Sequence, residues 1–587
     1  MNKFFSVFSS VLFISVFFAF TWLKVDASQV ASPSKNTELG QLIKNLASSD
    51  VDLVKDSIGE LAKTGDPRLE NFFELYRQGS VYNWPTESGD VRIVVNEETI
   101  MDDDFNEFAP LLDPLSGEPY LVTDVQAKPD LLELEDISPS RKLRSLVNSS
   151  KFLLRLFSTD YTVRLSGVKK CGDPSFLPAA IPYLEEIAND ETEDEKIRFT
   201  AKESIELMVL SGAIEAKKSP EDRLFALSKL GDLKSLRAYA RLDTFEDELE
   251  SMKELSTQEL SEAKASISRV RKKIQDHKDT VELSGNLFRG VSYGSVLVLI
   301  ALGLAITFGL MGVINMAHGE LMMIGAYTTY EVQMLFGHTP DNPVNHYYLV
   351  ALPVAFLVAA LVGLIMEGLV VRHLYNRPLE SLLATWGVGL LLIQVVRIIY
   401  GDNIGVNSPT WARGGFEISQ DIVLPYARLY LLGLSFLSVG FIYFIIRKTR
   451  FGMLIRATMQ NRDMASSLGV RTRKIDRLTF ALGSGIAGVA GYGWTIIGGV
   501  TPDMGQTNFI VDSFLVVVTG GVGELLGVIC SGLGIGVLTK LIEPLEIGTF
   551  TIGPVWGKVI LLALIVGFIQ YRPSGLFAPK GRLADKK

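Results

Sequence analysis

A succession of apolar runs fills the second half of this 587-residue chain. Each run is long enough, or nearly long enough, to cross the hydrocarbon core of a bilayer as a helix. We therefore expect an all-α polytopic membrane protein with about nine crossings. Only two residues separate the runs 508–520 and 523–541. This short separation predicts a hairpin of short spans or a re-entrant pair. The runs cover 288–310, 319–336, 348–371, 380–400, 429–446, 478–500, 508–520, 523–541 and 556–571.

Charge divides the chain near residue 285. Residues 28–285 alternate apolar and charged side chains, and contain 49 acidic and 33 basic residues, a net charge of −16. Residues 286–587 contain 16 acidic and 22 basic residues, a net charge of +6. We therefore predict a soluble part followed by a transmembrane domain at 286–587.

The first 27 residues resemble a signal peptide. A lysine precedes a long apolar run, and Val25 and Ala27 fit a signal-peptidase site after Ala27. The run is long for a cleaved signal, so an uncleaved anchor is the alternative. Either outcome sends residues 28–285 across the membrane.

Three segments of the soluble part share one pattern, in which a Gly-Asp pair separates two amphipathic helices. Glycine can end the first helix in a left-handed conformation, and aspartate can cap the second. Residues 28–243 are therefore predicted to be an N-terminal extracytoplasmic, mainly α-helical HEAT-like repeat domain, with unrelated helical hairpins as the alternative. The segments are 52–78, 161–187 and 219–242, with pairs at Gly65-Asp66, Gly172-Asp173 and Gly231-Asp232.

Two other patterns interrupt this series. Segments 91–95 and 119–122 are predicted strands around an acidic stretch, Asp102-Asp103-Asp104, which we expect to be a solvated loop. Residues 244–285 are predicted to be a helical linker. Its narrow apolar stripe at 267–274 suits a spacer and a docking helix equally well.

Basic residues set the predicted orientation. The connection 447–477 holds nine Lys and Arg, and the C-terminal tail is also basic, so both are expected in the cytoplasm. Loop 337–347 holds no Lys or Arg, and loop 542–555 holds no basic residue, so both are expected outside. Counting spans back from residue 447 puts the soluble part outside, as the signal peptide does. We predict a multi-pass protein of the inner (plasma) membrane with an extracytoplasmic N-terminal domain and a cytoplasmic C-terminus.

Polar residues inside the apolar part are candidates for a translocation path, because such residues are costly at membrane depth. Asn315, His318 and Glu320 lie within GVINMAHGE, between the first two spans, and Asp512 lies four residues into a short span. The segment 312–319 is either a tight turn that satisfies freed backbone groups or a broken helix that lines the path. Glu367 and Arg397 lie near span ends, where we expect snorkelling.

The basic loop contains RATMQNRDMASSLGVRTRKIDR at 456–477. Its Asp463-Met464-Ala465, followed by Leu468 and Gly469, resembles in degenerate form the Glu-Ala-Ala…Gly loop of ABC-importer permeases. Asp replaces Glu and Met replaces the first Ala. The resemblance implies that this segment is a short helix that docks in a cleft of an ATPase subunit.

Four further strings are similar to the branched-chain amino acid (LivH-like) permeases of that family, and together they cover nearly all of 286–580. Within that branch, a long N-terminal extension after a signal peptide resembles the permeases of urea importers. The strings are IALGLAITFGLMGVINMAHGELMMIGAY at 300–327, RPLESLLATWGVGLLL at 377–392, VVTGGVGELLGVICSG at 517–532 and YRPSGLF at 571–577.

This resemblance implies a transmembrane permease subunit of a binding-protein-dependent ABC importer. Implied partners are a second permease subunit of the family, two cytoplasmic ATPase subunits, an external solute-binding protein, membrane lipid and a small-molecule substrate. The expected substrate is urea, with a branched-chain amino acid or a short amide as the alternative. A membrane sensor with an external ligand-binding domain is the alternative from another class.

Enzyme activity is not expected of this chain. Its sequence holds no GxxxxGK[ST] phosphate loop, so ATP hydrolysis is expected on the partner subunits. It also holds no HExxH, CxxC or GxSxG signature. No catalytic residue, metal site, cofactor or nucleic-acid partner is predicted.

Overall fold

Two compact units make up the chain in the computed structural model: Met1–Gln275, named unit 1, and Asp276–Lys587, named unit 2. The predicted signal peptide and the acidic loop at Asp102-Asp103-Asp104 lie outside the described residues. The structure describes residues 33–577, apart from 49, 86–91, 97–98, 102–106, 123–124, 174–179, 213, 215–218, 252–255, 340–342, 376, 419–420 and 548–549.

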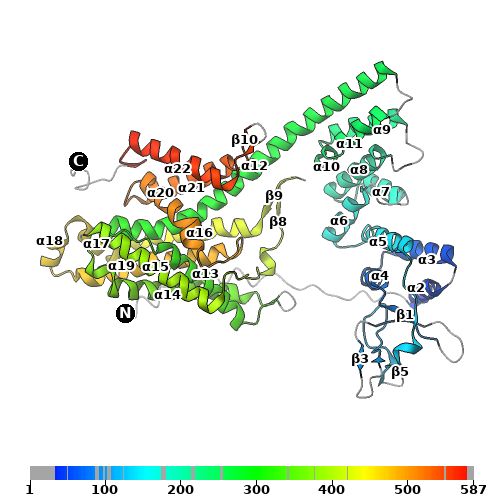
Figure 1. Ribbon diagram of the computed structural model, residues 1–587, viewed down its shortest axis with the longest axis horizontal. Helices are drawn as coiled ribbons and strands as arrows, with labels where there is room; N and C mark the ends of the chain where they lie inside the picture. Colours follow the sequence, from blue (N-terminus) through cyan, green and yellow to red (C-terminus); the bar gives the residue numbers. More distant parts are fainter. Residues whose placement is uncertain are drawn as a thin grey trace. The chain divides into compact units, whose positions relative to one another are not determined.

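Helices dominate unit 1 (Figure 1). Aspartate side chains cap three of them, since Asp50, Asp160 and Asp194 accept backbone N–H groups where α3, α6 and α8 begin. The elements are α2 (Pro33–Lys44), η1 (Asn45–Ala47), α3 (Val51–Lys63), α4 (Arg68–Gln78), η2 (Leu131–Glu133), α5 (Arg141–Arg155), α6 (Tyr161–Cys171), α7 (Ile181–Asn189), α8 (Glu195–Leu210), α9 (Pro220–Asp232), α10 (Leu236–Tyr239) and α11 (Leu242–Ser251).

The Gly-Asp pairs behave differently from one another. Gly65 has a left-handed backbone (φ 69°), and Asp66 accepts the Arg68 N–H at 3.0 Å before α4, as predicted. Gly172 has φ −79°, so the prediction of a left-handed end is wrong there. It is also wrong at Gly231, which lies inside α9. The repeat class itself stays a prediction.

A close contact explains Gly231. A β-carbon at this position would stand 3.0 Å from the side chain of Val270, so glycine allows α9 and the following long helix to approach each other. The chain turns three residues later instead, at Lys234, which has φ 53°.

A small sheet interrupts the helices of unit 1. β1 (Val81–Asn83) pairs antiparallel with both β2 (Ile93–Val95) and β7 (Glu135–Asp136), with Val81 opposite Val95. The predicted strand at 91–95 is therefore present as β2. The predicted strand at 119–122 is present only as the two-residue β5. The remaining strands are β3 (Ile100–Met101), β4 (Glu107–Phe108), β5 (Leu121–Val122) and β6 (Val125–Gln126).

The apolar stripe of the linker is a docking surface. It lies on α12 (Thr257–Met311), a continuous helix whose residues belong first to unit 1 and then to unit 2. Ile267 and Ile274 are fully buried in a cluster with residues of α8 and α9 such as Leu207 and Leu227. The linker therefore packs on unit 1 and is not a free spacer.

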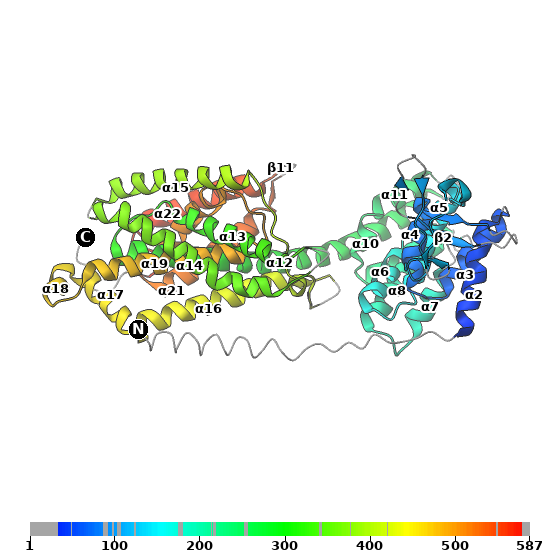
Figure 2. The same ribbon diagram turned by 90° about the horizontal axis from the view of Figure 1, so that it is seen from below.

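Unit 2 is a bundle of helices that run roughly along one direction (Figure 2). Every predicted apolar run overlaps a helix, although α19 ends at Trp494, before the end of the run 478–500. The elements after α12 are α13 (His318–Leu335), α14 (His346–Leu369), η5 (Val371–His373), α15 (Pro378–Tyr400), η6 (Thr410–Ala412), β8 (Gly415–Glu417), β9 (Val423–Pro425), α16 (Tyr426–Lys448), α17 (Arg450–Gln460), α18 (Arg462–Ser467), α19 (Thr472–Trp494), the π-helix η7 (Gly505–Phe509), α20 (Ile510–Gly520), α21 (Leu525–Ile542), β10 (Glu546–Ile547), β11 (Phe550–Thr551) and α22 (Gly553–Tyr571).

Six helices among the described residues are long and apolar enough to cross a membrane. Helices α13, α19 and α20 also follow predicted runs but are not among the six, because they are short or rich in glycine and polar residues. The count of nine crossings therefore stays a prediction. The six spans are Gln258–Gly309, His346–His373, Leu379–Tyr400, Tyr426–Lys448, Leu525–Ile542 and Gly553–Tyr571.

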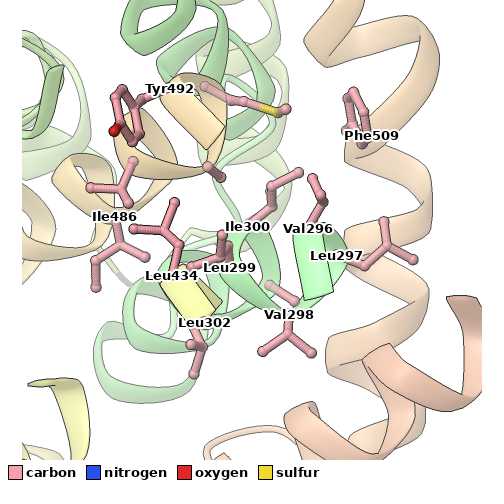
Figure 3. Close-up of a cluster of buried hydrophobic side chains, with 14 of the residues drawn as sticks. Val296, Leu297, Val298, Leu299, Ile300, Leu302, Leu434, Ile486, Tyr492 and Phe509 are labelled. Carbon is pink, nitrogen blue, oxygen red and sulfur yellow. The ribbon is translucent and has the colours of Figure 1, made fainter. Parts of the chain in front are cut away.

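The core of unit 2 lies around the second half of α12 (Figure 3). Residues from Val296 to Leu302 of this helix are buried and pack beside Leu434 of α16, Tyr492 of α19 and Phe509 of η7. Helix α19 packs against both α13 and α14, and almost all of its residues beyond Thr479 are buried.

The loops of unit 2 gather at opposite ends. In both views α17 and α18 lie at one end, whereas the hairpins β8–β9 and β10–β11 lie at the other (Figures 1 and 2). The basic loop thus lies at the opposite end from β10–β11, which belong to the segment 542–555 that the charge pattern placed outside. Which end faces the cytoplasm stays a prediction.

Candidate functional site

Side-chain oxygens accept two backbone N–H groups in the break between α12 and α13. Gly312 adopts a left-handed conformation (φ 68°) just after α12 ends. The Asn315 Oδ1 accepts the Ala317 N–H at 3.1 Å, and the Thr385 hydroxyl of α15 accepts the Met316 N–H at 3.0 Å. These contacts are what a tight turn inside apolar surroundings requires.

Three polar atoms in the same stretch have no hydrogen-bond partner. They are Asn315 Nδ2, His318 Nδ1 and Glu320 Oε2, and all three side chains are buried. Unsatisfied polar atoms are rare in protein interiors because each costs free energy. Whether the break is a tight turn or a broken helix that lines the path stays a prediction.

His318 and Glu320 face different helices. The His318 Nε2 lies 3.1 Å from the Ile300 carbonyl oxygen of α12, and Gly303 provides the space for its ring. The Glu320 carboxyl group lies against α15, where a β-carbon on Gly389 would stand 3.2 Å from it. His318 is therefore enclosed in the core, whereas Glu320 faces α15, a helix with little buried surface.

Asp512 belongs to a separate place. Its Oδ2 accepts the hydroxyl of Tyr293 on α12 at 2.9 Å. Tyr293 precedes Ile300 by seven residues, so this contact lies about 10 Å along α12 from that of His318. The four predicted path residues thus form two groups, Asn315 to Glu320 at the break and Asp512 beside Tyr293.

A glycine pair connects these two regions. Gly319 of α13 contacts the backbone of Gly505, the first residue of η7. The contact places a π-helical turn directly against the first turn of α13. Isolated π-turns occur frequently at functional sites.

The predicted coupling segment forms the short helix α18. The Asn461 side chain accepts the Met464 N–H at 3.0 Å at its start. Gly469 ends it in a left-handed conformation (φ 84°), and the Val470 N–H donates to the Ala465 carbonyl at 3.0 Å. This is the hydrogen-bond pattern of a helix that a glycine terminates.

The side chains of this segment divide into two sets. Met464 and Leu468 are 58% and 78% exposed, and Asp463 is also exposed. Ala465 is buried, so it faces the rest of unit 2. Gly469 is exposed, and nothing lies near its missing β-carbon.

An ionic network that the sequence did not predict holds α18. Arg462 forms an ion pair with Asp476 of α19, and its guanidinium lies 4.9 Å from the ring centre of Tyr375. The Tyr375 hydroxyl donates to Glu367 Oε1 of α14 at 3.0 Å. Arg477 stands 3.3 Å from the other Glu367 oxygen, an ion pair without hydrogen-bond alignment.

This network corrects the expectation for Glu367. Its side chain is buried and bonded, so it does not snorkel, because Tyr375 and Arg477 supply partners inside the unit. Arg397 does lie at a span end, where it pairs with Asp402 at 2.8 Å. The signal for this network in the sequence was Glu367, a carboxylate inside the apolar run 348–371.

Comparison with known proteins identifies the unit that carries these sites. The sequence profile described as branched-chain amino acid transport system, permease component, matches residues 286–569. These residues form a permease domain of that family. The permease domain accounts for nearly all of unit 2, whereas residues before 286 lie outside the match.

Individual relatives are similar over the permease domain. LivH of Methanocaldococcus jannaschii, a probable branched-chain amino acid transport permease protein, is 29% identical over 49% of this chain and 90% of its own. BraD of Pseudomonas aeruginosa is 27% identical over 49% of this chain and 94% of its own. LivH of Escherichia coli is 28% identical with the same coverage. No solved structure shows a significant match.

The permease domain makes this chain a multi-pass membrane protein and a transport component, not an enzyme. The residues from Asp463 to Gly469 lie inside the matched region. So do the α12–α13 break and Asp512.

Proposed function

We propose that this chain is a membrane-spanning permease subunit of an ABC importer, and that α18 is the part that docks on an ATPase. The observation that carries the proposal is the exposure of Met464 and Leu468 on a helix that the protein otherwise holds firmly in place. A soluble loop has no need of an ordered apolar surface. A helix that enters a groove needs apolar anchors and a fixed base.

The proposed importer has further subunits. A second permease of the family pairs with this one, and the similarity of this chain to LivM of Escherichia coli, 26% identical, supports such a pair of related subunits. Two cytoplasmic ATPases bind at α18, and an external protein delivers the solute. The N-terminal unit then lies outside the cell and the C-terminus inside, as the basic loop predicts.

The network around Arg462 supplies a route for coupling. When the ATPases close on ATP, movement of α18 passes through Arg462 to Asp476 of α19, and through Tyr375 to Glu367 of α14. Helix α19 packs against α13, which carries Glu320. A shift of α18 therefore reaches the α12–α13 break through packed helices.

The substrate that the relatives favour is a branched-chain amino acid, because their names describe transport of those amino acids. Urea or a short amide is the second candidate, since the long N-terminal extension resembles that of urea permeases. Asn315 Nδ2 and Glu320 Oε2, a donor and an acceptor without partners, suit a neutral amide also. A sensor with an external domain is the alternative from another class, and neighbouring genes for a kinase would favour it.

Co-purification tests the docking proposal. We expect Leu468→Asp to insert normally but to lose the ATPases in detergent extracts, with a loss of binding free energy of at least about 2 kcal/mol. Met453→Asp on α17, at an apolar side chain that is 55% exposed against 78% for Leu468, is the control outside α18 and should retain them. Gly469→Asp is less informative because any side chain at its positive φ strains the backbone.

An equal ATPase yield from Leu468→Asp and wild type would contradict docking through α18. An equal loss of the ATPases from both Asp variants would show that the interface includes α17. Uptake measured on the same strains shows whether loss of the ATPases also stops transport.

A further inference from the structure

Two charged side chains, Asp512 and Lys540, contact Tyr293 of α12, and Glu543 and Lys558 lie nearby in unit 2. Lys540 and Glu543 at the end of α21 form an ion pair at 2.7 Å, and Lys540 lies 5.2 Å from the ring centre of Tyr293. Asp512 of α20 accepts the Tyr293 hydroxyl. Lys558 of α22 lies beside Asn508, four residues before Asp512 in the sequence. Lys540 and Glu543 thus neutralise each other, which leaves one charge of each sign.

Asp512 and Lys558 are these two charges. Asp512 is only 3% exposed, and the neutral Tyr293 hydroxyl is its hydrogen-bond donor. The Lys558 Nζ lies 3.4 Å from the Asn508 carbonyl oxygen, which is also uncharged. Among the residues that the structure describes, Asp512 and Lys558 form no ion pair with each other.

Charges in this position require a partner. Asp512 lies within a predicted span and Lys558 lies in the sixth position of α22, one of the apolar helices long enough to cross a membrane. Both residues lie near the first turns of their helices, and the buried Asp512 carboxylate needs a hydrogen-bonding or charged partner, because burial removes its solvation by water. Asn508 belongs to the π-helix η7, whose altered turn presents its carbonyl to Lys558.

We propose that Asp512 and Lys558 form a binding site for the two charged ends of a zwitterionic solute. The Lys558 ammonium binds the solute's carboxylate, and the Asp512 carboxylate binds the solute's ammonium. An α-amino acid carries both groups, whereas urea carries neither. The site rests on the proposed import function and deepens it by assigning the residues that select the solute. Since Asp512 is enclosed, the site is closed in this structure and opens when α20 or α22 moves.

A structural latch is the competing explanation for the four charges. A latch holds the helix ends together and has no preference among solutes. A binding site responds to the charged groups of the solute itself. Analogues of one solute, tested on the wild-type protein, therefore separate the two without any variant that must fold.

The first experiment uses the assembled wild-type importer in lipid nanodiscs without the solute-binding protein. Labelled L-leucine is bound and competed by leucinamide, which lacks the carboxylate, and by 4-methylpentanoate, which lacks the ammonium. We expect each analogue to compete about tenfold or more weakly than leucine, because each loses one charge-assisted contact. Urea should not compete. Equal competition by leucine and both analogues, or no leucine binding at all, would overturn the site.

Variants then assign the residues. Lys558→Met and Asp512→Asn should each raise the leucine Kd about tenfold or more, and Lys558→Arg should restore it to within about twofold of wild type. Arg397→Met, which removes a cation from α15 that pairs with Asp402, is the matched control and should leave the Kd unchanged. An unchanged Kd in Lys558→Met and Asp512→Asn would overturn the assignment even if the importer takes up leucine. Absence of import by the wild type would instead contradict the proposed function.

Discussion

Gly319 in α13 and Gly505 in η7 meet backbone against backbone. A β-carbon on Gly319 would lie 2.7 Å from the carbonyl carbon and oxygen of Gly505. Gly319 stands between His318 and Glu320, and Gly505 opens the π-helix that leads to Asp512. This crossing therefore fixes both groups of predicted path residues relative to each other.

The crossing predicts that Gly319→Ala destabilises the permease domain. Neither backbone can give way without moving a helix, so we expect a cost of about 1–3 kcal/mol, as in other overpacked cores. Gly387→Ala on α15 is the matched control, because nothing lies within 4 Å of its missing β-carbon. Thermal unfolding of both purified variants in detergent measures the difference. Equal midpoints would show that the helices at this crossing adjust freely.

The network under α18 predicts a compensated pair of variants. Arg462→Met leaves the buried Asp476 without its cation, which we expect to lower stability by about 2 kcal/mol. This is less than for a fully buried pair because Arg462 is partly exposed. Adding Asp476→Asn should restore stability but not coupling, so ATP hydrolysis continues while uptake falls. Wild-type uptake per ATP in the double variant would contradict the coupling route.

The sequence predicted well what depends on local pattern. The apolar runs gave the helix positions of unit 2, and the Asp463–Gly469 segment is a short helix with an exposed Met464 and Leu468. Contacts between distant residues were not accessible. The Arg462–Asp476 pair and the role of Gly231 against Val270 depend on tertiary packing, which no single-sequence periodicity records. Strands as short as β1 give too few residues for an alternating pattern.

For the candidate sites too, the sequence indicated what depends on local pattern and did not indicate contacts between distant residues. The sequence selected Asn315, His318, Glu320 and Asp512 because polar residues are costly in apolar runs. It did not separate the enclosed His318 from Glu320, which faces α15, and it did not include Lys558. Lys558 lies within the predicted run 556–571. The pattern of that run does not indicate a role for it, because the proposed role depends on Asp512 of another helix.

Unit 1 should lose one contribution to stability in acid. Hydrogen bonds from Arg77, then Gln78 and Lys151, lower the pKa of Glu74 to about 2. Since the folded pKa lies below the unfolded value of about 4.3, the contribution is present above pH 4.3 and is lost as the pH falls towards 2. The difference in thermal midpoint between wild type and Glu74→Gln should therefore be larger at pH 7 than at pH 3. A constant difference would show that these bonds do not depend on the Glu74 charge.

Uptake of labelled solute tests the central claim most directly. Cells with and without this gene, in the presence of the other importer subunits, are given labelled L-leucine or labelled urea. We predict ATP-dependent accumulation of leucine that requires the gene, that Leu468→Asp abolishes and that Met453→Asp retains. Accumulation of urea instead of leucine would agree with the proposed import function but would contradict the proposed substrate. Equal uptake of both solutes with and without the gene would contradict the account.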